Sequence, residues 1–207
     1  MSVINQLAYS LGINSEEPNK ELANKIVAAN DKKAIKELIE NLNNKVARIQ
    51  SNCVKVLYEV GEQKPELIAP YAKDFIDLLD HKNNRLVWGA MTALSGIVLE
   101  NAQLMYNNIA KIVAVANAGT VITKDHAVNI LVKLGTIKAY NDTAVILAME
   151  QLFHAPENQF PTYAEKTMPI LPQVHKAAFL KILQDRLPDI ATETKQKRLA
   201  KLIKKLS

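Results

Sequence analysis

The sequence is poor in several residue types that mark particular classes of protein. Its 207 residues include one cysteine, so no disulfide can form within the chain. With 6 glycines, 8 prolines and 5% aromatic residues, it does not have the composition of a collagen-like or low-complexity chain. No apolar run approaches the ~18 residues that a membrane-spanning helix requires, and the first residues do not resemble a signal peptide. We therefore expect a globular cytoplasmic protein that does not associate with membranes.

Motifs of enzymes and metal sites are also missing from the sequence. There is no glycine-rich phosphate loop, no paired-cysteine motif and no His-Glu metal signature. None of the four histidines has a second histidine or a cysteine three or four residues away, the spacing that brings ligands together on a helix. Cys53 has no nearby histidine and is expected to be a buried, inert thiol. The sequence predicts no catalytic residue, no metal site and no cofactor.

Positive charge is concentrated at the C-terminal end of the chain. The formal net charge is +5, and residues 186–207 contain seven basic residues against two acidic ones. The rest of the chain is therefore neutral overall. The basic character belongs to this one segment and does not mark the whole molecule as a nucleic-acid binder.

Apolar positions recur every 37 residues through the middle of the chain. The stretch 83–98 is the clearest copy, and its Ala90 is in register with Cys53 and Ala127. In each copy, apolar residues recur at i, i+3, i+4 and i+7, which places them on one face of an α-helix. One repeat is therefore two helices joined by a turn, and the protein is predicted to be all-α.

The N-terminal segment fits this register poorly and is expected to be a cap. It is predicted to contain a short helix over residues 3–11, which ends at a left-handed Gly12, and a second helix over 15–30. The second repeat is expected to open with one helix from Pro65. We predict a single domain over residues 1–207, with a cap at 1–30, repeats at 31–63, 64–100, 101–138 and 139–187, and a basic C-terminal capping helix in 188–207.

The pattern degrades in the fourth repeat. Four prolines lie within residues 156–172, and each lacks a backbone N–H donor and restricts the preceding residue. A long second helix cannot form there. We expect short helices over 162–168 and 174–187, followed by a closing helix over 193–206.

The helix pairs resemble a known repeat family over roughly residues 31–155. The pattern is Leu78-Leu79-Asp80 … Leu86 … Ala90 … Leu94. It is similar to HEAT repeats, whereas tetratricopeptide and ankyrin repeats have shorter periods of ~33 to 34 residues. The resemblance implies a right-handed α-α superhelix, a solenoid of about four HEAT-like hairpins with irregular caps, in which the second helices line the concave side.

Helical periodicity also predicts which side chains of the second helices point away from the hairpin core. Trp88 shares its register with Ser51 and Asp125, so the fold does not require an apolar residue there. A tryptophan near Arg48 and Arg85 has the composition of an interface anchor, although it could instead pack against the neighbouring hairpin. The candidate partner-binding residues are Arg48, Lys55, Tyr58, Arg85, Trp88 and Asn129.

Two glycines lie in the same helix as Trp88. Gly89 and Gly96 cost ~1 kcal/mol each relative to alanine inside a helix. They indicate close approach either of a neighbouring helix or of a ligand.

Taken with the HEAT resemblance, these features predict a monomeric, non-catalytic scaffold that binds a protein or peptide segment. The alternative is nucleic-acid binding by the basic closing helix, which could also be a cap with its charges in solvent. The DNA alkylation-repair glycosylase family, similar in size and in helical-repeat architecture, relies on a basic groove with tryptophans and a catalytic aspartate. Only Trp88 and Asp125 could correspond to those groups. The nucleic-acid candidates are Lys195, Lys197, Arg198, Lys201, Lys204 and Lys205.

Overall fold

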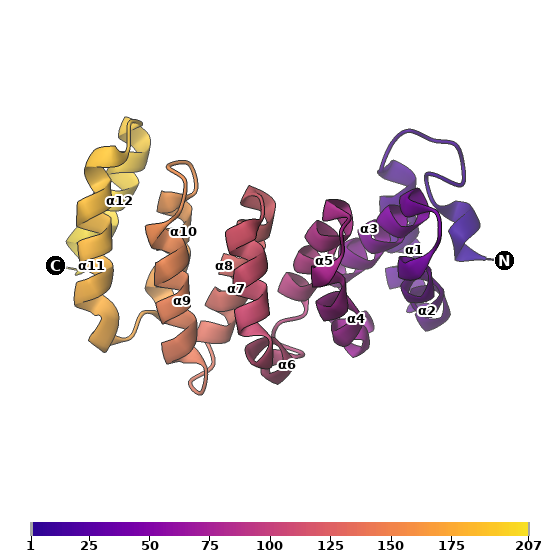
Figure 1. Cartoon of the computed structure of the whole chain (residues 1–207), viewed down its shortest axis with the longest axis horizontal. Coiled ribbons are helices and arrows are strands. Elements are labelled where there is room, and N and C mark those ends of the chain that lie inside the picture. The colour runs from indigo at the N-terminus through magenta and orange to yellow at the C-terminus, as the bar shows by residue number, and fades with distance from the viewer. Residues whose placement is uncertain (1, 207) are drawn as a thin grey trace. The chain divides into compact units, whose positions relative to one another are not determined.

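A computed structural model describes residues 2–206 of the chain. Within these residues the regular secondary structure consists of α-helices and short 3-10 helices, without a strand (Figure 1). The chain consists of two compact units, unit 1 (Met1–His126) and unit 2 (Ala127–Ser207). Between residues 2 and 206, no helix combines the length and the apolar character needed to cross a bilayer.

Unit 1 begins with the 3-10 helix η1 (Val3–Gln6), a loop and α1 (Glu17–Ala29). The prediction of a helix over residues 3–11 is wrong beyond η1. The Ala8 N–H donates to the side-chain oxygen of Asn19 at 2.9 Å instead of to a helical carbonyl, so the chain leaves the helix. The left-handed conformation predicted for Gly12 is confirmed at φ 70°.

The first hairpin consists of α2 (Lys32–Glu40), the 3-10 turn η2 (Asn41–Asn43) and α3 (Ala47–Gln63). Asp31 begins α2 because its carboxylate accepts hydrogen bonds from the N–H groups of Lys33 and Ala34 at 3.1 and 3.0 Å. The apolar stripes of both helices are buried as the spacing predicts, since Leu38 and Leu57 are each 0% exposed. Each such side chain stabilises the fold by ~1.5–3 kcal/mol through its burial.

The single helix predicted from Pro65 is wrong, because it is broken into short pieces. They are η3 (Pro65–Leu67), η4 (Ala69–Tyr71), α4 (Ala72–Asp77) and η5 (Leu78–Asp80). Pro65 and Pro70 lack the N–H that a continuous helix needs. The elements that follow are α5 (Asn84–Gly96), α6 (Ala102–Asn107), α7 (Ile109–Ala118) and α8 (Val121–Gly135), and the boundary between the units falls within α8.

Helix α3 contacts both α1 and α5. A Cβ on Gly89 of α5 would lie 2.5 Å from a methyl carbon of Val54 on α3, so only glycine allows this approach. At Gly96 the nearest atom to a Cβ would be the carbonyl oxygen of Gly61, also on α3, at 3.4 Å. At Gly89 the close neighbour is therefore a helix, whereas at Gly96 a Cβ would make only an ordinary van der Waals contact with α3.

Unit 2 continues after α8 with helices whose positions agree with the sequence pattern. Phe160, Tyr163 and Phe179 are buried in its core, together with apolar residues of α12. The proline-rich segment contains only short helices, as predicted, and the closing helix is confirmed. The elements are α9 (Asn141–Phe153), α10 (Phe160–Thr167), η6 (Met168–Ile170), η7 (Gln173–His175), α11 (Lys176–Arg186), η8 (Leu187–Asp189) and α12 (Glu193–Leu206).

Candidate functional site

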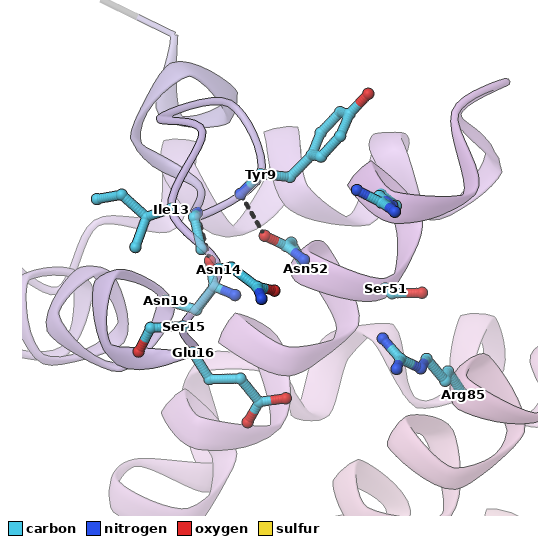
Figure 2. Close-up of a pocket in the computed structure, with 11 residues that line it drawn as sticks. Tyr9, Ile13, Asn14, Ser15, Glu16, Asn19, Ser51, Asn52 and Arg85 are labelled. Carbon is cyan, nitrogen blue, oxygen red and sulfur yellow. Dashed lines mark hydrogen bonds between the residues drawn. The ribbon is translucent and has the colours of Figure 1, made fainter.

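Unit 1 carries an open groove made of two adjoining hollows along α3 and α5, called here the unit 1 groove. The first hollow, of about 500 Å³, lies between the N-terminal loop and the starts of α3 and α5 (Figure 2). The second, of about 290 Å³, continues along α5 to Trp88, Thr92 and Ile122. The residues common to both hollows are Glu16, Asn19, Ser51, Asn52 and Arg85.

Five of the six candidate partner-binding residues line this groove. Arg48 lines the first hollow, Arg85 lines both, and the other three line the second. Asn129 belongs to unit 2, where its side-chain oxygen accepts a hydrogen bond from Lys166 at 2.6 Å. The five groove residues are Arg48, Lys55, Tyr58, Arg85 and Trp88.

The 37-residue register explains why these side chains share one surface. Arg48 is the second residue of α3, Arg85 occupies the same position in α5, and Ile122 is the equivalent residue of α8. All three line the groove. Since equivalent positions of stacked hairpins face the same way, the repeat produces a row of side chains along the groove.

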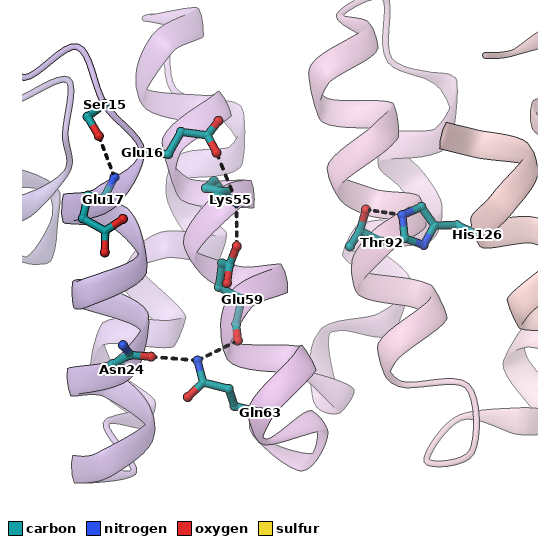
Figure 3. Close-up of polar contacts among 9 residues, drawn as sticks. All are labelled: Ser15, Glu16, Glu17, Asn24, Lys55, Glu59, Gln63, Thr92 and His126. Carbon is teal, nitrogen blue, oxygen red and sulfur yellow. Dashed lines mark hydrogen bonds and ion pairs between the residues drawn. The ribbon is translucent and has the colours of Figure 1, made fainter. Parts of the chain in front are cut away.

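Trp88 is half-buried and lines the second hollow. Its carbonyl accepts a hydrogen bond from the Thr92 hydroxyl at 2.9 Å, and the same hydroxyl lies 3.0 Å from Nε2 of His126 (Figure 3). Because the hydroxyl hydrogen is donated to Trp88, His126 donates from Nε2. These bonds join α5 to the first turns of α8 beside the tryptophan.

Lys55 is held by groups of the protein itself. Its ammonium pairs with Glu59 and Glu16 (Figure 3), at 2.5 and 3.2 Å. It also lies 4.7 Å from the centre of the Tyr58 ring. Burial disfavours its charged form, but the hydrogen bonds with Glu59, Tyr58 and Glu16 outweigh that effect and raise the pKa of Lys55. Its positive charge is therefore already neutralised.

Arg48 and Arg85 supply the uncompensated charge of the groove. Both side chains are exposed. In the described part of the chain, the ion pairs of arginine involve Arg186 and Arg198, and none involves Arg48 or Arg85. The guanidinium of Arg48 lies 5.8 Å from the centre of the Tyr9 ring, a cation-π contact that leaves its N–H donors available.

The N-terminal loop forms one wall of the groove, and sequence reasoning missed it. The Tyr9 N–H donates to the side-chain oxygen of Asn52 at 3.0 Å, which ties the loop to α3 (Figure 2). Glu16, at the end of the same loop, reaches Lys55. The loop lies outside the 37-residue register, so periodicity carried no signal for these residues.

Similarity to known proteins is found at the level of structure. No family model and no curated protein matches the sequence. A designed armadillo repeat protein in complex with the peptide (KR)4 superposes with a TM-score of 0.71 at 16% identity, over 91% of this chain and 87% of that chain. A second designed armadillo repeat protein superposes with a TM-score of 0.67 at 14% identity, over 99% of this chain and 98% of that chain. An engineered protein solved by the Northeast Structural Genomics Consortium superposes with a TM-score of 0.65 at 16% identity, over 100% of this chain and 97% of that chain.

The chain has an armadillo/HEAT-like helical-repeat fold. The predicted all-α solenoid and the resemblance to HEAT repeats are thereby confirmed. In a fold built from stacked repeats, function depends on the side chains that the repeats present.

In this armadillo/HEAT-like chain, the basic closing helix α12 packs into the core of unit 2. Leu199, Leu202 and Leu206 are buried there. Three of the nucleic-acid candidates form ion pairs with acidic side chains. The pairs are Lys195 with Glu157 at 3.9 Å, Lys197 with Glu193 at 2.7 Å and Arg198 with Glu165 at 2.6 Å. Lys201, Lys204 and Lys205 are exposed. The positive charge of α12 is therefore partly compensated by acidic neighbours.

The described part of this repeat fold holds no group of three His, Cys, Asp or Glu side chains that could bind a metal ion. Cys53 is 0% exposed, and burial, with a smaller effect of Glu37, raises its pKa to about 12. The buried thiol predicted from the sequence is confirmed. Asp125 is half-buried and lines neither hollow of the groove.

Proposed function

We propose that this protein is a non-catalytic scaffold that binds an extended segment of a protein partner in the unit 1 groove. The observation that carries the proposal is the convergence of Trp88, Tyr58, Arg48 and Arg85 on one groove. Tryptophan, tyrosine and arginine are the residues that most often dominate the binding energy of protein interfaces. The designed armadillo repeat protein in complex with a peptide is a precedent for this use of the fold.

The groove suits a peptide better than a compact ligand. It is open and runs along two helices, and its lining combines apolar surface from Trp88 and Ile122 with polar side chains such as Ser51 and Asn52. An extended peptide needs both kinds of surface, because its backbone groups require hydrogen-bonding partners while alternate side chains require apolar contacts. Trp88 would be the anchor, since a half-buried aromatic ring loses little conformational freedom when it is covered.

A peptide library displayed on phage and selected on the full-length chain tests the proposal. Each selected peptide is labelled, and its dissociation constant is measured by fluorescence anisotropy. We expect Trp88→Ala to weaken binding by ~30-fold or more, since an anchor residue contributes ~2 kcal/mol or more. Thermal unfolding of Trp88→Ala is measured in parallel, because a folded variant is required.

Phe153→Ala is the matched control, because Phe153 is an aromatic residue of unit 2 that is 50% exposed. It is expected to leave affinity unchanged. The proposal is wrong if no library peptide binds, or if the selected peptides bind Trp88→Ala as tightly as the wild type.

A further inference from the structure

We infer that the segment bound in the unit 1 groove is acidic, with Asp or Glu carboxylates facing Arg48 and Arg85. This inference rests on the proposed function and specifies the chemistry of the partner. Of the side chains that line the groove, three are basic and one, Glu16, is acidic. Lys55 is paired with both Glu16 and Glu59, so these three side chains together carry −1, and the positive charge left for a partner is that of the two arginines.

The positions of the two arginines strengthen the preference for an anion. Arg48 is the second residue of α3, and Arg85 is the second residue of α5. The N-terminal end of a helix carries partial positive charge, so a cation there is disfavoured and an anion is favoured. A carboxylate near these two helix starts would interact favourably with both guanidinium groups and with both helix dipoles.

Guanidinium geometry matches a carboxylate directly. The planar group offers two parallel N–H donors to the two oxygens of one carboxylate, which adds geometric specificity to the attraction. A carboxylate fits beside a basic side chain of this groove, since Oε2 of Glu16 lies 3.2 Å from Nζ of Lys55. A basic segment such as (KR)4 would instead face two uncompensated positive charges.

An acidic peptide is favoured over a nucleic acid by the amount of available charge. Nucleic-acid affinity comes largely from neutralising several phosphates at once. The groove offers two uncompensated cations, so it would release few counterions from a nucleic acid. A peptide needs only one or two carboxylates at the right spacing, together with an apolar side chain for Trp88.

Three labelled octapeptides with blocked ends and the same leucine spacing provide the test: EELEELEE, QQLQQLQQ and KKLKKLKK. Anisotropy titrations use the full-length chain at low and high NaCl, with an eight-nucleotide oligo-dT as a fourth probe. We expect the acidic peptide to bind at least tenfold more tightly than any other probe, with affinity that falls as salt rises. Arg48→Gln/Arg85→Gln should weaken its binding at least tenfold.

The matched control is Lys138→Gln/Lys181→Gln, which makes the same change in net charge at two exposed lysines of unit 2. This control should not alter the affinity. The inference is overturned if the acidic peptide does not bind, if another probe binds as tightly, or if both double variants weaken binding equally. Library peptides that require Trp88 but show no acidic preference would leave the proposed function standing, whereas the lack of any Trp88-dependent peptide would remove both.

Discussion

At the scale of single residues, Gly89 controls how closely two helices of unit 1 approach. We predict that Gly89→Ala destabilises the protein by up to ~2 kcal/mol, because overpacking costs ~1–3 kcal/mol while alanine restores ~1 kcal/mol of helix propensity. The added Cβ would lie 2.5 Å from Val54, which is buried and β-branched and so cannot turn aside easily. Urea unfolding measures the change.

Gly96→Ala is the matched control for this prediction, because it makes the same change in the same helix. Its new Cβ would meet its nearest neighbour at 3.4 Å, an ordinary van der Waals contact, so we expect stability equal to that of the wild type or higher by up to ~1 kcal/mol. A Gly89→Ala variant that is more stable than the wild type would show that the contact between α3 and α5 is looser than described.

Cys53 gives a second test at the same scale. Its side chain is 0% exposed, and burial raises its pKa to about 12, so very little reactive thiolate exists at neutral pH. We predict that iodoacetamide labels the native protein only as fast as it unfolds, and labels it rapidly in concentrated urea. Mass spectrometry follows the reaction, and rapid labelling of the folded chain would contradict the burial of this residue.

At the scale of elements, α12 is joined to α10 by Arg198 and Glu165, which lie 2.6 Å apart. The hydrogen bond from Arg198 lowers the pKa of Glu165, although burial opposes it. A carboxyl group with a lowered pKa in the folded state stabilises the protein above its ordinary pKa, and this contribution is lost as the pH falls through the lowered value. Stability from this pair is therefore present at neutral pH and lost in acid.

We predict that Arg198→Met destabilises the protein at pH 7 by up to ~1 kcal/mol, because both side chains are partly exposed. The difference from the wild type should shrink as the pH falls below 4.5, the ordinary pKa of the glutamate. Lys197→Met, which breaks an exposed pair on the same helix, is the control and should change stability by less than ~0.5 kcal/mol. If the stability difference between Arg198→Met and the wild type does not depend on pH, the assigned role of Glu165 is wrong.

The elements that the sequence predicted well are those with local signals. Apolar spacing locates α3 and α5, and the prolines account for the short helices after α9. The failures arose where tertiary contacts or proline override periodicity. The segment after η1 leaves the helix because Asn19 binds the Ala8 N–H, and a pattern of apolar residues does not reveal such a bond.

At the scale of the whole molecule, the repeat explains both the fold and part of the candidate site. Equivalent positions in successive hairpins could be identified from the register, which is why Arg48, Arg85 and Trp88 were found from the sequence. The wall formed by Tyr9 and Glu16 was not found, because the N-terminal loop belongs to no repeat. A register also cannot indicate that Lys55 pairs with an acid from that loop, because the loop lies outside it. The prediction of one domain over residues 1–207 stays a prediction.

The central claim is that the unit 1 groove is the place where a partner segment binds. Trp88 is the one tryptophan of the chain, so tryptophan emission reports on this groove alone. Titrating the full-length chain with a library-selected peptide should shift this emission, with a midpoint equal to the dissociation constant found by anisotropy. A peptide that binds with the same affinity but leaves the emission of Trp88 unchanged would place the binding site elsewhere and contradict the account.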